Sequence, residues 1–444
     1  MDWRLTEVCT GDSQLPAPLN SPIEKALALN LDPLKYGTIA EIGAGQEVAR
    51  WFFQAGATAG TVAKTMSAYD MNFSDEIYGP SKDKRYVSKQ RLEKMLEKEF
   101  DLVLSRIEAH RPEGSTFFAF ANTVKAQGYN KRGECHGWMG IRFQRAPKLA
   151  PDEIILHARL LDDTNIEQQE ALGQLGVNLI YGAFFLRDAP ERMLHSLMDN
   201  LKWGRVEIDL VEMRGPTLGS LDDRLMALEI VKGSLARAVL FDPDGKVVIP
   251  ADALYKKSVL AMRGRFDPIT PSEINRFKDA KNRFTGTLSA LGPTPSNNVI
   301  QLAEMTMADL ANNETIDTRD FLARVTALAA AGYYVLISEF FRYFRVRQYL
   351  SRYTREPVGM VAGTAGFAEI FREDYYDGLA GGMLEGLGQL FPDKTLAYFY
   401  PVLEDGQIKT LEDVPIAAHL KPLFTYLKDR GRIISVDDYA GDDV

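Results

Sequence analysis

Residues 35–56 read KYGTIAEIGAGQEVARWFFQAG, and this stretch decides the fold class. Residues 35–42 favour a buried strand, which runs into Gly43 and Gly45. Residues 46–54 then favour a helix. A strand, a glycine turn and a helix in this order form a Rossmann-like first β-α turn.

Outward from this turn, the hydrophobic pattern predicts further helices and strands along the chain. Helices are expected at residues 88–110 and 171–185, and strands at 116–121, 138–144, 153–161 and 206–210. From residue 221 to residue 400, helical and strand-like runs alternate with short connections, which favours a largely parallel sheet. We therefore predict an α/β protein with two lobes: a mixed N-terminal one, and a C-terminal one with a largely parallel sheet and flanking helices.

The domain boundaries follow from composition. Residues 1–35 are interrupted by prolines and are expected to form an N-terminal arm, with a short helix starting at Ser21-Pro22. The N-terminal lobe is then expected at residues 36–215 and the C-terminal lobe at 216–444, with Gly215-Pro216 between them.

Composition excludes several classes of protein. The chain has 444 residues and a net charge of −9, which argues against general nucleic-acid binding. Its two cysteines, Cys9 and Cys135, form no CxxC pattern, so neither a disulfide framework nor a metal site is expected. No secretory signal is apparent, and the apolar runs are shorter than the ~18 residues of a membrane span. We expect a cytoplasmic protein without a membrane span.

The glycine turn is the first candidate site. A turn with Gly43 and Gly45 lets a phosphate approach the N–H groups at a helix start. Asp70 comes 25 residues after Gly45, which is later than the usual ~20 for a ribose-binding acid but within reach. The run Glu41–Gly45 also resembles the first motif of nucleotide-type methyltransferases. Val48 stands where the dinucleotide motif has its third glycine. The alternative is a tight turn that needs glycine for steric reasons alone.

A basic cluster at residues 263–265 is the second candidate. Arg263 and Arg265 follow a predicted strand, at the end where parallel sheets bind ligands. Arginine holds a phosphate by two parallel hydrogen bonds, so this cluster predicts anion binding. The alternative is internal ion pairing.

Two shorter motifs have a functional and a plain interpretation. Cys135-His136 offers a nucleophile beside a base, but no third partner is identifiable, and the alternative is a loop leading into a strand. Asp242-Pro-Asp-Gly245 offers two magnesium ligands, but its residues favour a β-turn. The catalytic residues therefore stay unassigned.

Two segments near the C-terminus suggest subunit contacts. Residues 340–355 contain five arginines and no acid around an aromatic stripe, which is typical either of an interface or of a helix packed on its own domain. Residues 378–388 are glycine-rich within a helical pattern, which favours close packing against another helix or subunit. We expect a homo-oligomer.

Several runs, including YGTIAEIGAGQEVARWFFQAG, CHGWMGIRFQ and LYKKSVLAMRGRF, resemble a broadly distributed bacterial family of uncharacterised proteins of similar length. Its members carry conflicting names, among them nicotinate-nucleotide adenylyltransferase and an outer-membrane receptor. The HxGH motif of such adenylyltransferases is missing, because His136-Gly137 has no preceding histidine. The resemblance implies a common cytoplasmic protein and assigns no catalytic residue.

The first functional hypothesis is an enzyme or sensor that binds a phosphorylated small molecule, with a nucleotide as the expected cofactor class. Its binding residues are Gly43, Gly45, Asp70, Arg263 and Arg265. The alternative is a non-catalytic, homo-oligomeric assembly or scaffold protein.

Overall fold

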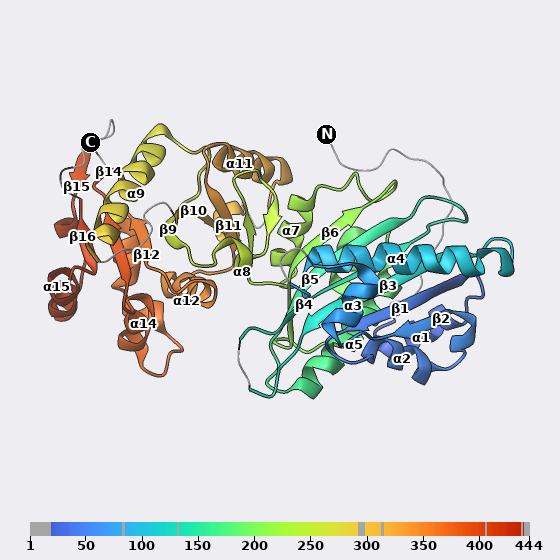
Figure 1. Cartoon of the computed structure of the whole chain (residues 1–444). Helices are drawn as coiled ribbons and strands as arrows, with labels where there is room; N and C mark the ends of the chain where they lie inside the picture. Colours follow the sequence, from blue (N-terminus) through green and yellow to red (C-terminus); the bar gives the residue numbers. More distant parts are fainter. Residues whose placement is uncertain are drawn as a thin grey trace.

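A computed structural model describes residues 19–81, 85–130, 133–291, 298–311, 315–404, 406–436 and 438. It has two large sheets with flanking helices (Figure 1), so the predicted α/β class with two sheets is confirmed. The division at residues 215 and 216 stays a prediction. The proline-rich residues 1–18 of the expected arm lie outside the described residues.

The first sheet is six-stranded, with the order β2-β1-β3-β4-β5-β6. Its strands are β1 (Lys35–Ile42), β2 (Val62–Met66), β3 (Thr116–Lys125), β4 (His136–Phe143), β5 (Asp152–Leu160) and β6 (Val206–Arg214). The β1 strand pairs in parallel with β2 and β3, whereas β3 to β6 are antiparallel. The sheet is therefore mixed, as the sequence predicted.

Helices cover both faces of the first sheet. They are α1 (Pro22–Asn30), α2 (Glu47–Ala55), α3 (Met71–Tyr78), α4 (Lys89–Ile107), α5 (Asn165–Phe185) and α6 (Pro190–Ser196). On one face α1, α2 and α5 pack together, and on the other face Leu92 and Leu96 of α4 pack against Trp138 and Ile155. Thus α1, expected within the arm, is part of the packed lobe; Ala26 and Leu29 are fully buried.

The second sheet is eight-stranded, with the order β16-β13-β12-β9-β10-β11-β7-β8. Its strands are β7 (Ala238–Phe241), β8 (Val247–Val248), β9 (Ser258–Arg263), β10 (Val299–Thr306), β11 (Tyr334–Ser338), β12 (Val358–Ala362), β13 (Thr395–Phe399) and β16 (Ile433–Ser435). From β11 to β16 all neighbours are parallel, and β7 and β8 add an antiparallel edge. The six parallel strands lie in the order β11-β10-β9-β12-β13-β16. This is the doubly wound order, in which the first parallel strand of the chain, β9, is the neighbour of the fourth, β12.

The connections of the second lobe are mostly helical. Its α-helices are α7 (Asp223–Lys232), α8 (Pro250–Ala253), α9 (Pro271–Leu291), α10 (Met307–Leu310), α11 (Thr318–Ala330), α12 (Tyr343–Tyr353), α13 (Thr364–Ile370), α14 (Gly382–Leu390) and α15 (Lys421–Asp429). The second lobe also has a hairpin of β14 (Val402–Glu404) and β15 (Gln407–Lys409) and short 3-10 turns at η4 (Glu373–Tyr376), η5 (Leu411–Asp413) and η6 (Ala418–Leu420). Two further 3-10 turns, η1 (Thr58–Gly60) and η2 (Glu108–His110), belong to the first lobe.

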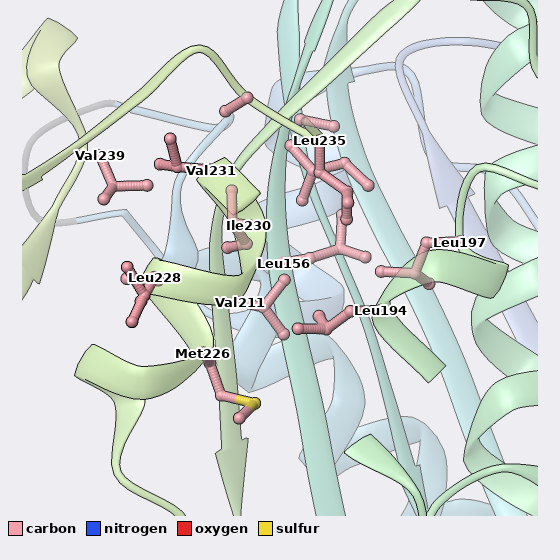
Figure 2. Close-up of a cluster of buried hydrophobic side chains, with 14 of the residues drawn as sticks. Leu156, Leu194, Leu197, Val211, Met226, Leu228, Ile230, Val231, Leu235 and Val239 are labelled. Carbon is pink, nitrogen blue, oxygen red and sulfur yellow. The ribbon is translucent and has the colours of Figure 1, made fainter. Parts of the chain in front are cut away.

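One hydrophobic cluster joins the two lobes. The α7 helix contacts both β6 of the first sheet and β7 of the second. Figure 2 shows Ile230 of α7 close to Val211 of β6, and Val231 on the side of Val239 of β7. The lobes therefore share a core through α7. No helix within the described residues is long and apolar enough to cross a bilayer.

Candidate functional site

Two histidines and a carboxylate form a hydrogen-bonded chain on the α4 face of the first sheet. His136 of β4 contacts His157 of β5, with 3.0 Å between Nδ1 and Nε2. His157 in turn contacts Asp209 of β6, with 2.6 Å between Nδ1 and Oδ1. We call Asp209, His157 and His136 the relay. His157 and Asp209 are buried, whereas His136 is partly exposed.

A bulge in β6 brings Asp209 under His157. The register pairs His157 with Leu210 but Ala158 with Ile208, so Asp209 is the additional residue. Ile208 belongs to the core on the α5 side and Leu210 to the core on the α4 side. Bulges re-aim side chains and are frequent beside active sites. Here the bulge lies between Ile208 and Leu210, so these two side chains point to opposite faces of the sheet.

The carboxylate fixes the protons of the relay. The carboxylate of Asp209 accepts, so Nδ1 of His157 carries a proton. With both rings neutral, Nε2 of His157 then accepts from Nδ1 of His136. This leaves Nε2 of His136 unprotonated. Burial, and then the neighbouring His157, lower the pKa of His136 to about 4, so its ring is neutral at neutral pH. Among the described residues, Oδ2 of Asp209 is buried without a hydrogen-bond partner.

The relay ends at a cavity between the two lobes. This relay cavity has a volume of about 760 Å³, and both histidines and Trp138 line it. The opposite walls come from the start of α4, with Ser88 and Lys89, and from residues 247–253 around β8 and α8. Its size lies within the range of small-molecule sites, roughly 300–1,000 Å³.

A buried arginine lies next to the relay on the same strands. Arg159 of β5 donates to Glu134 and to Glu207. Its guanidinium carbon lies 5.6 Å from the ring centre of Tyr353, which belongs to α12 of the second lobe. The two glutamates pair the buried charge of Arg159, and the contact with Tyr353 links the first sheet to the second lobe.

At the predicted glycine site, the side chain of Glu41 occupies the start of the α2 helix. The N–H groups of Val48 and Ala49, at the start of α2, donate to the carboxylate of Glu41 at 3.2 and 3.1 Å. Gly43 has φ +99°, and a Cβ there would lie 1.9 Å from the carbonyl oxygen of Val124. Glycine is therefore required at residue 43 for steric reasons.

The other two residues of that prediction lie close to this turn. The N–H of Gly45 donates to the hydroxyl of Tyr69 at 2.6 Å. Asp70, the next residue, caps α3 by accepting from the N–H of Phe73 at 2.8 Å. Tyr69 therefore brings Gly45 and Asp70 into one region, and their cofactor role stays a prediction.

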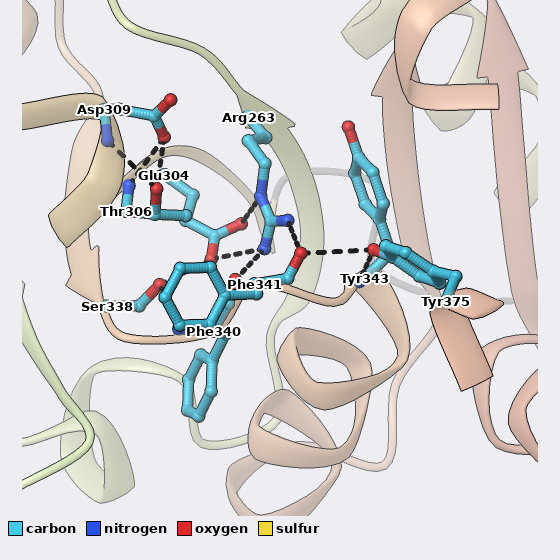
Figure 3. Close-up of polar contacts among 9 residues, drawn as sticks. All are labelled: Arg263, Glu304, Thr306, Asp309, Ser338, Phe340, Phe341, Tyr343 and Tyr375. Atoms are coloured by element: carbon cyan, nitrogen blue, oxygen red, sulfur yellow. Dashed lines mark hydrogen bonds and ion pairs between the residues drawn. The ribbon is translucent and has the colours of Figure 1, made fainter. Parts of the chain in front are cut away.

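The predicted arginines lie at β9 of the second sheet and in the loop that follows it, whereas the glycine turn follows β1 of the first sheet (Figure 1). Arg263, at the end of β9, donates to Glu304 at 3.0 and 3.1 Å and to the carbonyl oxygens of Phe340 and Phe341 (Figure 3). It also lies 4.5 Å from the ring centre of Tyr343. Internal contacts thus hold its guanidinium. The Arg265 side chain is exposed. Their role in anion binding stays a prediction.

The segment at Asp242 forms the β-turn that its residues favour, and Cys135 contacts a side chain of the same chain. The N–H of Gly245 donates to the carbonyl oxygen of Asp242 at 2.8 Å, which closes a β-turn, and Asp242 Oδ1 accepts from the N–H groups of Asp244 and Lys246 at 3.0 and 2.9 Å. Cys135 is buried and lies 3.1 Å from the amide oxygen of Gln127. Within the described residues no group of three or more histidine, cysteine, aspartate or glutamate side chains is placed so that it could hold a metal ion.

The segments that suggested subunit contacts pack within the chain. The stripe of α12, formed by Tyr343, Val346, Leu350 and Tyr353, is buried. Gly386 of α14 lies against Tyr376, where an added Cβ would be 2.0 Å from the ring. These contacts account for both sequence features, and the homo-oligomer stays a prediction.

Sequence reasoning named His136 but missed its partners. His157 and Asp209 are 21 and 73 positions further along the chain and carry no motif of their own. The available signal was one polar side chain within each of two predicted strands, at His157 and Asp209. A polar residue at such a position needs a partner, which strand alternation alone does not identify.

No protein-family model matches this chain, and no curated protein does either. Among solved structures, it is similar to a competence-damaged protein (CinA) superfamily protein from Enterobacter cloacae, with 14% identity over 40% of this chain and 98% of that chain, and a TM-score of 0.28. A competence/damage inducible protein CihA from Agrobacterium tumefaciens gives 16% identity over 37% and 96%, with a TM-score of 0.27. These TM-scores carry no argument about activity.

Proposed function

We propose that the protein is an enzyme that binds a small phosphorylated molecule in the relay cavity and exchanges a proton with it through His136. One observation carries this proposal: the chain from Asp209 through His157 to His136 ends at the wall of a cavity of about 760 Å³. A histidine oriented by a second group is the usual arrangement of a general base.

The relay compensates for the low basicity of a buried imidazole. When Nε2 of His136 accepts a proton, its Nδ1 proton passes to Nε2 of His157. The positive charge then rests on His157, whose Nδ1 lies 2.6 Å from the carboxylate of Asp209. That carboxylate stabilises the His157 cation by charge attraction and by a hydrogen bond, so the proton taken up at His136 is balanced by a charge on a paired ring.

The opposite wall of the cavity suits a phosphate. The start of α4, a helix of 19 residues, lies there, and helix starts attract anions. Lys89 is paired with Glu212, and Arg85 lies 2.9 Å from Asp252. Because Arg85 and Asp252 are both mostly exposed, their ion pair is worth little, and a phosphate can replace the carboxylate.

Substitutions that separate binding from proton transfer test the proposal. The substrate would be sought by native mass spectrometry of the purified protein and by incubation with sugar phosphates and nucleoside monophosphates. With such a substrate, Asp209→Asn is expected to keep binding and lower turnover by roughly 10²–10⁴-fold, because the amide cannot stabilise the His157 cation. Arg85→Gln is expected to weaken binding instead.

The control is His195→Gln, which changes an exposed histidine of α6 outside the relay cavity. It is expected to leave turnover unchanged. Full turnover in both Asp209→Asn and His136→Gln would overturn the proposal, as would equal binding of the substrate and its dephosphorylated form.

A further inference from the structure

A second cavity, of about 750 Å³, lies on the other side of Arg159 and shares no lining residue with the relay cavity. The exposed face of Trp203 and the side chains of Arg237 and Arg352 are among its walls. Trp203 lies on the turn between α6 and β6, and Arg352 on α12, so both lobes contribute. Nothing in the relay uses this cavity.

Trp203 is unusually accessible for a tryptophan. Its exposed fraction is 72%, whereas Trp138 in the relay cavity is 4% exposed. Tryptophan is mostly buried in proteins, so an exposed indole at a cavity indicates a surface that a ligand covers. An aromatic platform of this kind binds planar rings, and stacking of a nucleobase contributes about 1–3 kcal/mol.

Arg352 is the arginine of this cavity with capacity for an external anion. Arg159 is held by two glutamates, and Arg237 donates to Glu339 at 2.5 Å. Within the described residues, the one ion-pair contact of Arg352 is with Glu207 at 4.0 Å, and its side chain is 47% exposed. That carboxylate already binds Arg159. The planar guanidinium of Arg352 can therefore bind a phosphate through two hydrogen bonds.

We propose that this cavity is a nucleotide-binding site, in which the base stacks on Trp203 and the phosphate is held by Arg352. A planar ring and an anionic group in one molecule match the two anchors of a single cavity. The site is independent of the proton-transfer function proposed for the relay cavity, and either can be correct without the other.

Calorimetric titration with AMP, adenosine and ribose 5-phosphate tests the site. Trp203→Ala is expected to weaken AMP and adenosine binding about tenfold, and to leave ribose 5-phosphate unchanged, because stacking involves only the base. Arg352→Gln is expected to weaken AMP and ribose 5-phosphate about tenfold and to leave adenosine unchanged. In wild type, AMP is also expected to quench tryptophan fluorescence, and Trp203→Phe should remove this response.

Matched controls are Tyr426→Ala, an aromatic residue 59% exposed on α15, and Arg50→Gln, an arginine 59% exposed on α2. Both should bind AMP as wild type does. Absence of AMP binding at millimolar concentration would overturn the proposal, as would binding that neither cavity variant changes. Self-association in sedimentation that Trp203→Ala abolishes would also overturn it, because Trp203 would then lie in a subunit interface.

Discussion

Single residues set the geometry of the relay. A regular β6 strand would place Asp209 and Leu210 on opposite faces of the sheet. The bulge lets Asp209 reach His157 while Leu210 stays in the core beside α4. A one-residue deletion at the bulge would move one of these side chains to the other face. The chemistry proposed for the relay cavity thus depends on one additional residue in one strand.

Two glycines of α14 offer a matched test of packing at the same scale. Gly386→Ala is expected to destabilise the protein by about 1–3 kcal/mol, because the methyl group overlaps the ring of Tyr376. That ring cannot move freely: it is buried, and its hydroxyl donates to the carbonyl oxygen of Ile370 at 2.7 Å. Gly388 has open space at its Cβ position, so Gly388→Ala is expected to stabilise the helix by about 0.5–1 kcal/mol.

Urea unfolding of both variants beside wild type measures the two effects. Opposite signs are expected. A stabilising effect of Gly386→Ala would mean that Tyr376 does not pack on α14 as described.

At the scale of elements, the start of α2 is capped from the preceding strand. Glu41 at the end of β1 accepts from two N–H groups of α2 and from the side-chain amide of Asn122 at 3.2 Å. The strand thus carries the acceptor that its own crossover helix needs. A phosphate at this helix start would compete with Glu41, which distinguishes this turn from an open dinucleotide site.

The Glu41 cap predicts a dependence of stability on pH. Burial raises the pKa of Glu41 from 4.5 to about 7, against the lowering by its hydrogen-bond donors. Between these values the folded state keeps a proton that the unfolded state has released. The contribution of Glu41 to stability is therefore present below pH 4.5 and is lost as the pH rises through 7, by up to roughly 3 kcal/mol.

Denaturant unfolding of wild type and Glu41→Gln across this pH range isolates the effect. The free energy of unfolding of wild type, minus that of the variant, is expected to fall as the pH rises from 5 to 8. The variant cannot titrate at this position, so other groups cancel in the difference. A difference that is constant with pH, or that rises, would contradict the assignment.

At the scale of the whole molecule, α7 joins the hydrophobic cores of the two lobes. Its buried side chains pack against β6 on one side and β7 on the other (Figure 2). The charged contacts of Arg159 with Tyr353 and of Arg352 with Glu207 add polar links between the lobes. A fragment ending at residue 215 would lack α7, so the surface of β6 that α7 covers would be exposed.

Calorimetry is accordingly expected to give one unfolding transition for the described core, with equal van't Hoff and calorimetric enthalpies. Ile230→Ala removes a fully buried side chain of α7 and should cost about 2–5 kcal/mol while shifting the whole transition. Lys232→Ala, at an exposed position of the same helix, is the control. Two resolved transitions, of which Ile230→Ala shifts only one, would show that the lobes unfold separately.

The sequence by itself determined the local features of this protein. Apolar runs predicted most strands of the two sheets, although not β8 or β16. Ser21-Pro22 predicted the start of α1, and residues 35–56 predicted the first strand, turn and helix. Each depends on neighbours within a few positions, because propensity and periodicity act over one element. The same reasoning placed Gly43 correctly in a turn that requires glycine.

Only the tertiary structure decided which side chains meet. The relay joins His136, His157 and Asp209 from three strands, and its geometry depends on the antiparallel register and on a bulge that no local pattern indicates. Likewise, it decided that Glu41 occupies the start of α2 and that Glu304 binds Arg263. Such contacts follow from strand pairing over long sequence separations, which is fixed by the packing of the whole core and not by the residues beside each group.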